Sequence, residues 1–428
     1  MNRIILVGNG FDLAHGLATK YEDFINWYWD EWGAYLVGSG KDYITDGLCS
    51  FKLKNEVGLA GWYLVWGWHY RISTRDYPKR DLVELAKSDT KACDFKVHSI
   101  FFTEICKAVE EKGWVDIEAE YYRLLNSVYI SSPQNLNREF DIVRKKLIEY
   151  LLSIQNSKIN DSITLNPIQD CIMAPFSTKE IAIEAKNKWV DFIKSRINNE
   201  YLVDNIKLYK PSDARERAKK VCEFKADWQG QIDNQGVEFI DGDTLPSDML
   251  YPDRIMLLNF NYTNTADMYM PNDSYHFPIN HIHGTLDNPD SVIFGYGDEK
   301  DEKYQEISKL NNNDLLTNIK SIRYLEDVNY KNVLTFIESA PYQIYIMGHS
   351  CGTSDRTLLN TLFEHRNCVS IKPFYFQKDN MEDNYMEIVQ NISRNFSDAQ
   401  KMRDRVVNKK FCQPLPQSRP ESDTLTNG

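Results

Sequence analysis

Residues 4–24 read IILVGNGFDLAHGLATKYEDF, and this stretch decides the fold class. A short apolar run, residues 4–7, stops at Gly8-Asn9-Gly10 and passes into a helical pattern from about Phe11. This arrangement predicts a buried strand, a tight turn and a helix. Such a turn points backbone N–H groups at one spot, which suits phosphate, and glycines let a ligand approach the backbone. The alternative is that the two glycines only make a turn.

Asp12 does not fit a phosphate site, because its carboxylate would repel phosphate. It fits better as a helix cap or as an acceptor for ribose hydroxyls.

Short apolar runs that end in polar residues or glycine return after residue 250, and they alternate with helical patterns. They are RIMLLNF (254–260), INHIHGTL (279–286), SVIFGYGD (291–298), YQIYIMGHSCG (342–352) and VSIKPFYF (369–376). Strands that alternate with helices predict an α/β fold with a parallel sheet.

We therefore expect one discontinuous α/β domain, residues 1–30 plus 250–405, interrupted by a large, mainly helical insertion, residues 31–249. Aromatic residues at near-helical spacing in residues 21–37 predict a helix that faces a core, with an aromatic ligand site as the alternative. Residues 413–428 are polar and contain prolines, which predicts a disordered tail.

The bulk properties predict a soluble, cytoplasmic protein. Fifty basic and sixty-two acidic residues give a net charge of −12, which disfavours non-specific binding to nucleic acid or to an anionic membrane. The chain opens with too few apolar residues for a leader, and its most apolar stretch, residues 58–68, is too short to span a bilayer. Eight scattered cysteines without a Cys-x-x-Cys pair indicate a reducing compartment and no zinc ribbon.

Polar residues follow four of the predicted strands. They are Gly8-Asn9-Gly10, Asn261, His283-Gly284 and Gly348-His349-Ser350. Because ligands bind beyond the carboxyl ends of parallel strands, these residues predict a single cleft.

His281 and His283 lie two positions apart, so on a strand they would share a face and could bind zinc. No cysteine or carboxylate cluster lies beside them in the sequence, and we expect no metal. One histidine could instead transfer protons, for which its ordinary pKa is suited. The further alternative is that both are only hydrogen-bonded.

Residues 348–352, GHSCG, match the Gly-x-Ser-x-Gly nucleophile elbow of serine hydrolases. That arrangement needs an acid and a histidine later in the chain. His365 is the only histidine after Ser350, and Asp355 is the nearby acid. Both follow the serine so closely in the sequence that neither is expected at the end of a later strand. A serine hydrolase is thus the weaker interpretation, and Ser350 fits better as a donor to ligand phosphate or ribose.

The segments VGNGFDLAHGLATKYEDF, NFNYTN, HIHGTL, IFGYGDE and GHSCGTSD, in this order, resemble the AbiH family of bacterial abortive-infection proteins. One departure is Ala18, where proline is expected, and the insertion matches less distinctly. AbiH proteins are in turn similar to sirtuins, whose Rossmann-like domain binds NAD. The resemblance places Asn261 on the sirtuin asparagine and His283-Gly284 on the catalytic histidine-glycine pair. It also places Gly8-Asn9-Gly10 and Gly348-His349-Ser350 on the turns that contact NAD.

The departures from sirtuins narrow the activity that the resemblance implies. The zinc cysteines are absent, Asp12 replaces a serine, and Thr263 stands where an aspartate is expected. A deacylase is therefore disfavoured, and an NAD hydrolase (NAD glycohydrolase) that depletes NAD on infection remains. Asn261 and His283 would be catalytic. The NAD-binding residues would be Gly8, Asn9, Gly10, Asp12, Gly16, Gly284, Gly348, His349, Ser350 and Asp355.

NAD is expected as the substrate, with no further cofactor. A phage-derived trigger or partner protein and a homo-oligomer are the other partners that the resemblance suggests. Two alternatives stay open: a non-catalytic nucleotide-binding sensor of a defence system, and a serine hydrolase that uses Ser350.

Overall fold

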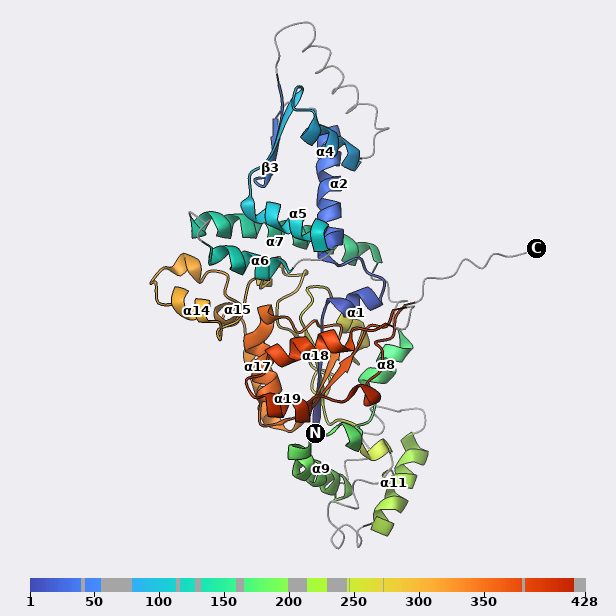
Figure 1. Cartoon of the computed structure of the whole chain (residues 1–428). Helices are drawn as coiled ribbons and strands as arrows, with labels where there is room; N and C mark the ends of the chain where they lie inside the picture. Colours follow the sequence, from blue (N-terminus) through green and yellow to red (C-terminus); the bar gives the residue numbers. More distant parts are fainter. Residues whose placement is uncertain are drawn as a thin grey trace, which may run out of the picture.

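The protein is described by a computed structural model (Figure 1). It describes residues 1–39, 43–54, 79–112, 116–127, 132–158, 165–198, 214–228, 245, 247–271, 273–378 and 382–418. The apolar stretch 58–68 lies outside these residues.

A five-stranded parallel sheet forms the centre of the molecule, and it confirms the predicted α/β class. The strand order is β6-β5-β1-β7-β8. The strands are β1 (Asn2–Val7), β5 (Ile255–Asn259), β6 (Ile279–His281), β7 (Tyr342–Met347) and β8 (Cys368–Phe374). In register, Ile4 lies opposite Met256 on one side and Ile344 on the other. Along the chain, β5 and β6 are therefore added on one side of β1, and β7 and β8 are then added on its other side. Crevices for ligands form where the strand order reverses in this way.

The two faces of the sheet are covered by different helices. Ile4 and Leu6 pack with α16 (Asn329–Ser339) and α17 (Arg356–Glu364), whereas Ile5 and Val7 pack with α1 (Asn9–Ala14) and α8 (Asn166–Ile172). Successive residues of a strand point to opposite faces, so a run that is apolar at every position suits a strand covered on both sides. Strand β1 is buried throughout for this reason.

The remaining helices of the sheet domain are short. They are α14 (Glu302–Ile307), α15 (Lys320–Arg323), α18 (Tyr385–Arg394) and α19 (Ala399–Arg405). The predicted strand at residues 291–298 is not formed, and Tyr296 makes only one isolated bridge, to Ile319. The apolar residues of this segment pack instead against the core of the insertion: Val292, Phe294 and Tyr296 are buried there.

Apart from α8, which packs on the sheet, the inserted residues and the start of α2 (Tyr21–Ser39) form two separate packed groups, one toward each end of the sheet strands (Figure 1). The first holds α2, α4 (Lys79–Ser88), α5 (Ile100–Lys112), α6 (Ile117–Leu125), α7 (Pro133–Lys158) and an antiparallel sheet of β2 (Tyr43–Thr45), β3 (Cys49–Leu53) and β4 (Cys93–Val97). The second contains α9 (Lys186–Asn198) and α11 (Ala214–Trp228).

Helix α2 confirms that the aromatic residues after position 21 face a core. Phe24, Tyr28 and Trp32 recur every four residues and are buried against α5 and α7. Phe102 of α5 lies 4.5 Å from Tyr28, measured between ring centroids. This spacing places the rings on one side of a helix, where they can be buried together.

The predicted disordered tail, residues 413–428, is wrong for residues 413–418. Leu415 is buried against the sheet domain, and its N–H donates to the Tyr375 carbonyl at 2.8 Å. The Ser418 N–H donates to the Ala14 carbonyl at 2.7 Å. A buried apolar side chain and backbone hydrogen bonds to Tyr375 and Ala14 hold this polar stretch against the sheet domain. Residues 419–428 lie outside the described residues.

Among the helices of the described residues, no segment is long and apolar enough to span a membrane.

Candidate functional site

A cavity of about 390 Å³ lies beyond the carboxyl ends of β1, β5, β6 and β7. The polar residues that follow these strands do converge, as the parallel topology predicts. The cavity is lined by Gly8, Asn9, Gly10, Asp12, Asn261, His283, Gly348, His349, Ser350 and Asp355, together with Lys20, Glu22, Asp116, Glu118, Leu147, Leu151 and Lys320. Asp116, Glu118, Leu147 and Leu151 come from the insertion, so both parts of the chain build the cavity.

The turns after β1 and β7 pack directly on each other. The Gly10 N–H donates to the Gly348 carbonyl at 2.8 Å, and a Cβ on Gly8 would lie 2.5 Å from the His349 Cα. The glycines were expected to make room for ligand phosphate. Their first role is instead to let two backbones touch, and the Gly10 N–H is already used within the protein.

Gly16 and Gly284, which were predicted to bind NAD, are not among the residues that line the cavity. Gly16 follows α1 with φ of +74°, and Gly284 has φ of +79° and would place a Cβ 2.2 Å from the Ser291 carbonyl oxygen. Both positions need glycine for backbone conformation, because other residues rarely adopt positive φ.

Asp12 is buried inside helix α1, with its side chain against the cavity. Its Oδ2 accepts a hydrogen bond from the Thr263 hydroxyl at 2.7 Å, whereas its Oδ1 has no partner among the described residues. Burial raises the pKa of Asp12 to about 6, although the Thr263 hydroxyl acts in the opposite direction. Gly8 occupies the N-cap position of α1, so Asp12 is not the helix cap. A buried carboxylate oxygen without a partner is suited to accept a ligand hydroxyl.

Asn261 is held beside the first turn by hydrogen bonds at both ends of the residue. Its backbone N–H donates to Asn259 Oδ1 at 3.0 Å, and its Nδ2 donates to the Gly8 carbonyl at 3.0 Å. Asn259 is fully buried and also donates to the Thr263 carbonyl. The loop after β5 is thereby fixed against the loop after β1.

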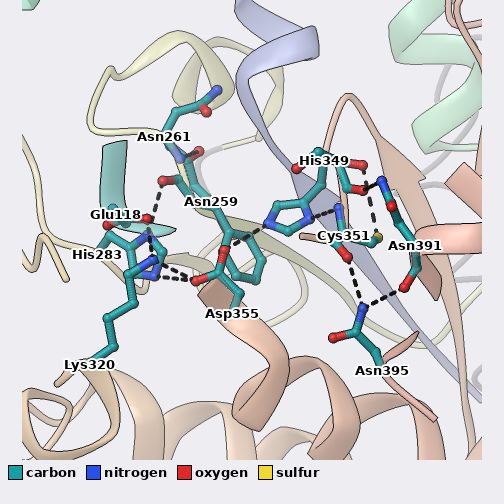
Figure 2. Close-up of polar contacts among 12 residues, drawn as sticks. Glu118, Asn259, Asn261, His283, Lys320, His349, Cys351, Asp355, Asn391 and Asn395 are labelled. Carbon is teal, nitrogen blue, oxygen red and sulfur yellow. Dashed lines mark hydrogen bonds and ion pairs between the residues drawn. The ribbon is translucent and has the colours of Figure 1, made fainter. Parts of the chain in front are cut away.

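His283 lies in a closely packed polar cluster (Figure 2). Its Nδ1 is 3.3 Å from the Phe260 carbonyl, and its Nε2 is 3.2 Å from the Tyr324 hydroxyl and 3.3 Å from Asp355 Oδ1. A carbonyl can only accept, so in the neutral ring Nδ1 carries the proton and Nε2 holds the lone pair. Burial, and then the charge of Lys320, lower the pKa of His283, which favours this neutral ring.

Asp355 lies at the centre of the cluster, between two histidines and a lysine. Lys320 Nζ is 2.8 Å from Asp355 Oδ1, and His349 Nε2 is 3.6 Å from Asp355 Oδ2. Burial opposes ionisation of Asp355, but the charge of Lys320 outweighs it and holds the pKa of Asp355 well below the ordinary value. The Cys351 N–H donates to His349 Nδ1 at 3.0 Å, so His349 Nε2 carries a proton toward Asp355.

Glu118 of α6 brings the insertion into the same cluster. Its Oε2 is 2.7 Å from Lys320 Nζ, and its Oε1 accepts the Gly295 N–H at 3.0 Å. Burial raises the pKa of Glu118 to about 8, with Lys320 acting in the opposite direction.

Glu118 and Lys320 were not predicted from the sequence. Glu118 shares the buried side of α6 with Tyr121, Tyr122 and Leu125, and a carboxylate on an apolar helix face is a signal that could have identified it. Lys320 carries no comparable signal, since it lies in a polar segment without regular periodicity.

His281 and His283 do not form a shared site. Strand β6 ends at His281, whose Nε2 lies 3.1 Å from Asp267 Oδ1, whereas His283 lies in the following turn and contacts Asp355. No group of three or more His, Cys, Asp or Glu residues within the described segments is arranged to hold a metal ion.

Ser350 does not have the geometry of a nucleophile elbow. The positive φ values of this turn belong to Gly348, at +79°, and Cys351, at +55°, and not to the serine. Ser350 is exposed, and among the described residues no hydrogen bond joins its hydroxyl to a histidine. Burial raises the pKa of the neighbouring Cys351 thiol, so the thiol stays protonated.

Comparison with known families gives the class of this protein. Residues 4–377 match the family described as bacteriophage abortive infection AbiH. The match covers most of the chain, including the residues that line the cavity. The chain belongs to the AbiH family, and this family implies a role in abortive-infection defence against phage. Neither a comparison with curated proteins nor one with solved structures gives a match.

Proposed function

We propose that this AbiH-family protein binds NAD and hydrolyses its nicotinamide–ribose bond during abortive infection. Numbered by their occurrence in the sheet, the strands follow the order 3-2-1-4-5, which is that of Rossmann-like dinucleotide-binding sheets. The cavity lies at the point where such sheets bind nucleotides, beyond the carboxyl ends of the central strands. The resemblance to sirtuin NAD-binding domains supports the same ligand.

The observation that carries the proposal is the acidic lining of the cavity. Five carboxylic acids line it: Asp12, Glu22, Asp116, Glu118 and Asp355. As the glycosidic bond of NAD breaks, positive charge moves from the nicotinamide ring to the ribose and gives an oxocarbenium-like transition state. Of these acids, Asp355 stays ionised beside Lys320, and Asp12 is ionised above about pH 6. Negative charge that these groups place near the ribose would stabilise the transition state, which lowers the barrier.

The proposed reaction uses residues that the structure places around one cavity. Asp12 Oδ1 would accept a ribose hydroxyl, and Asn261 would orient the ribose or the attacking water. The C1′–N bond breaks and its electron pair leaves with nicotinamide, while the water oxygen bonds to C1′. The proton that the water loses would pass to His283 Nε2, and Asp355 would balance the charge of the resulting imidazolium.

NAD is the substrate in this proposal, and no resident cofactor or metal is invoked. The insertion contributes Glu118 to the cavity, and a phage-derived trigger or partner protein remains a prediction. A homo-oligomer and a cytoplasmic location remain predictions.

The test is to incubate the full chain with NAD and to follow both binding and free nicotinamide. We expect NAD to raise the melting temperature and nicotinamide to accumulate with time. His283→Ala should abolish most of the release, whereas His276→Ala, a change in a loop outside the cavity, should not. Stabilisation by NAD without any nicotinamide would instead identify a nucleotide-binding sensor. If NAD neither raises the melting temperature nor releases nicotinamide, NAD is refuted as the ligand.

A further inference from the structure

Lys320 is a buried cation held by two acids from different parts of the chain. Its side chain is 1% exposed, and its Nζ lies 2.7 Å from Glu118 Oε2 and 2.8 Å from Asp355 Oδ1. Glu118 comes from the insertion, whereas Asp355 precedes α17 of the sheet domain. A buried charge is costly unless it is paired, so the arrangement of this cluster is more strictly fixed than that of a surface ion pair.

Lys320 and His283 meet the same oxygen atom. Asp355 Oδ1 is 2.8 Å from Lys320 Nζ and 3.3 Å from His283 Nε2. A protonated His283 would donate to this oxygen, which already accepts a hydrogen bond from the Lys320 ammonium group. Two positive charges that share one carboxylate oxygen repel each other, so Lys320 disfavours the protonated form of His283.

Building on the proposed function, we propose that Lys320 is a positioning residue that holds Asp355 and keeps His283 unprotonated and able to accept a proton. Glu118 fixes Lys320 from the insertion side. Asp355 stays ionised and adjacent, so it can balance the imidazolium once a proton arrives. A buried general base must be free of a proton before the reaction and must be stabilised after it accepts one. In this cluster Lys320 meets the first requirement and Asp355 meets the second.

The other groups that face His283 do not replace Lys320 in this role. Tyr324 contacts Nε2, and burial raises its pKa well above the ordinary value, so it stays neutral. His349 faces the other oxygen of Asp355, with its Nε2 3.6 Å from Oδ2. The Phe260 carbonyl accepts from Nδ1 and carries no charge.

The experiment measures the protonation of His283 directly, by NMR titration of the full chain labelled at histidine Cε1. The His283 signal is assigned as the one lost in His283→Gln. Lys320→Met alone leaves two buried acids without their cation and risks unfolding. The double variant Lys320→Met/Glu118→Gln removes the cation together with one of its two acids, and the amide oxygen of the introduced glutamine can still accept the Gly295 N–H. Lys320→Arg retains the charge.

We expect the pKa of His283 to rise by roughly 1 or more on the pH scale in the double variant and to stay near the wild-type value in Lys320→Arg. Arg323→Met, on the same helix α15, removes a cation that pairs with Glu326 instead and should leave His283 unchanged. In NAD hydrolysis, the acidic limb of the kcat/KM profile should move to higher pH with the double variant alone.

An unchanged pKa of His283 in the folded double variant would overturn the role of Lys320. This outcome differs from failure of the proposed function. If the wild type releases no nicotinamide, the hydrolase proposal fails, and the NMR titration still decides whether Lys320 controls His283. If the wild type is active and His283 does not respond, only the role of Lys320 fails.

Discussion

Gly10 and Gly348 are far apart in the sequence and touch backbone to backbone. The Gly10 N–H donates to the Gly348 carbonyl at 2.8 Å, and a Cβ on Gly348 would lie 2.1 Å from the Phe11 nitrogen. This contact joins the turn after β1 to the turn after β7. Both turns line the cavity, so the shape of the cavity depends on this contact.

Gly348→Ala should destabilise the fold. The residue has φ of +79° in addition to the clash, so positive-φ strain adds to overpacking. Together these cost roughly 2–5 kcal/mol. Gly352→Ala is the matched control in the same turn, because its nearest neighbour would be 3.6 Å away. Denaturant unfolding measures both changes. Equal stability of the two variants would show that the close contact of the turns is unimportant.

Removing the Leu415 side chain should also weaken the fold, because Leu415 is 4% exposed and packs against the sheet domain. Leu415→Ala is expected to cost about 2–5 kcal/mol in the free energy of unfolding. Leu310→Ala provides the control, since Leu310 is 63% exposed. If thermal melts of the two variants coincide, burial of the Leu415 side chain contributes nothing to stability.

Asp12 should make the wild type less stable as pH rises. Its folded pKa of about 6 is above the ordinary value of 3.8, so the folded state binds this proton more tightly than the unfolded state does. The cost is absent below about pH 4, grows between the two values and is complete above about pH 6, reaching on the order of 3 kcal/mol. Relative to Asp12→Asn, the wild type should lose stability over this interval. A difference between the two proteins that is constant from pH 4 to 8 would contradict the buried, proton-binding carboxylate.

Ser350→Ala should affect ligand binding more than turnover. The serine lines the cavity but has no base beside it, so it can contribute one hydrogen bond, typically worth about 0.5–1.5 kcal/mol. The dissociation constant for NAD should therefore increase by roughly 2- to 12-fold, as measured by calorimetry. A serine-directed fluorophosphonate should leave the wild type unlabelled. Labelling at Ser350 together with loss of ester hydrolysis in Ser350→Ala would establish the serine hydrolase instead.

The sheet and the convergence of its strand ends were predictable from the sequence because both follow from local pattern. Runs that are apolar at every position predict doubly covered strands, and parallel strands bring the residues that follow them, such as Asn261 and His283, to one edge. The contact between Gly10 and Gly348 was not predictable, since a glycine turn that admits a ligand and one that admits another backbone have the same sequence.

The charged part of the site was predicted only in part, for a different physical reason. Asp355 lies in a motif, but Lys320 and Glu118 are recruited from segments whose relative placement is set by tertiary packing. Binding of NAD at Gly16 stays a prediction, because the positive φ of its own turn already accounts for the glycine and Gly16 is not among the residues that line the cavity. Order at Leu415 was missed because one buried side chain outweighs a polar composition.

The most direct test of the central claim is a double-mutant cycle on nicotinamide release by the full chain. The wild type, Asn261→Ala, His283→Ala and the double variant are compared by kcat/KM for NAD, with Asn332→Ala, an exposed change on α16, as the control. We expect His283→Ala to lose roughly 10²- to 10⁴-fold, Asn261→Ala to be similarly impaired, and the double variant to be little worse than either, because both residues act on one step. Nicotinamide release that survives in both single variants, or that never occurs in the wild type, would contradict the account.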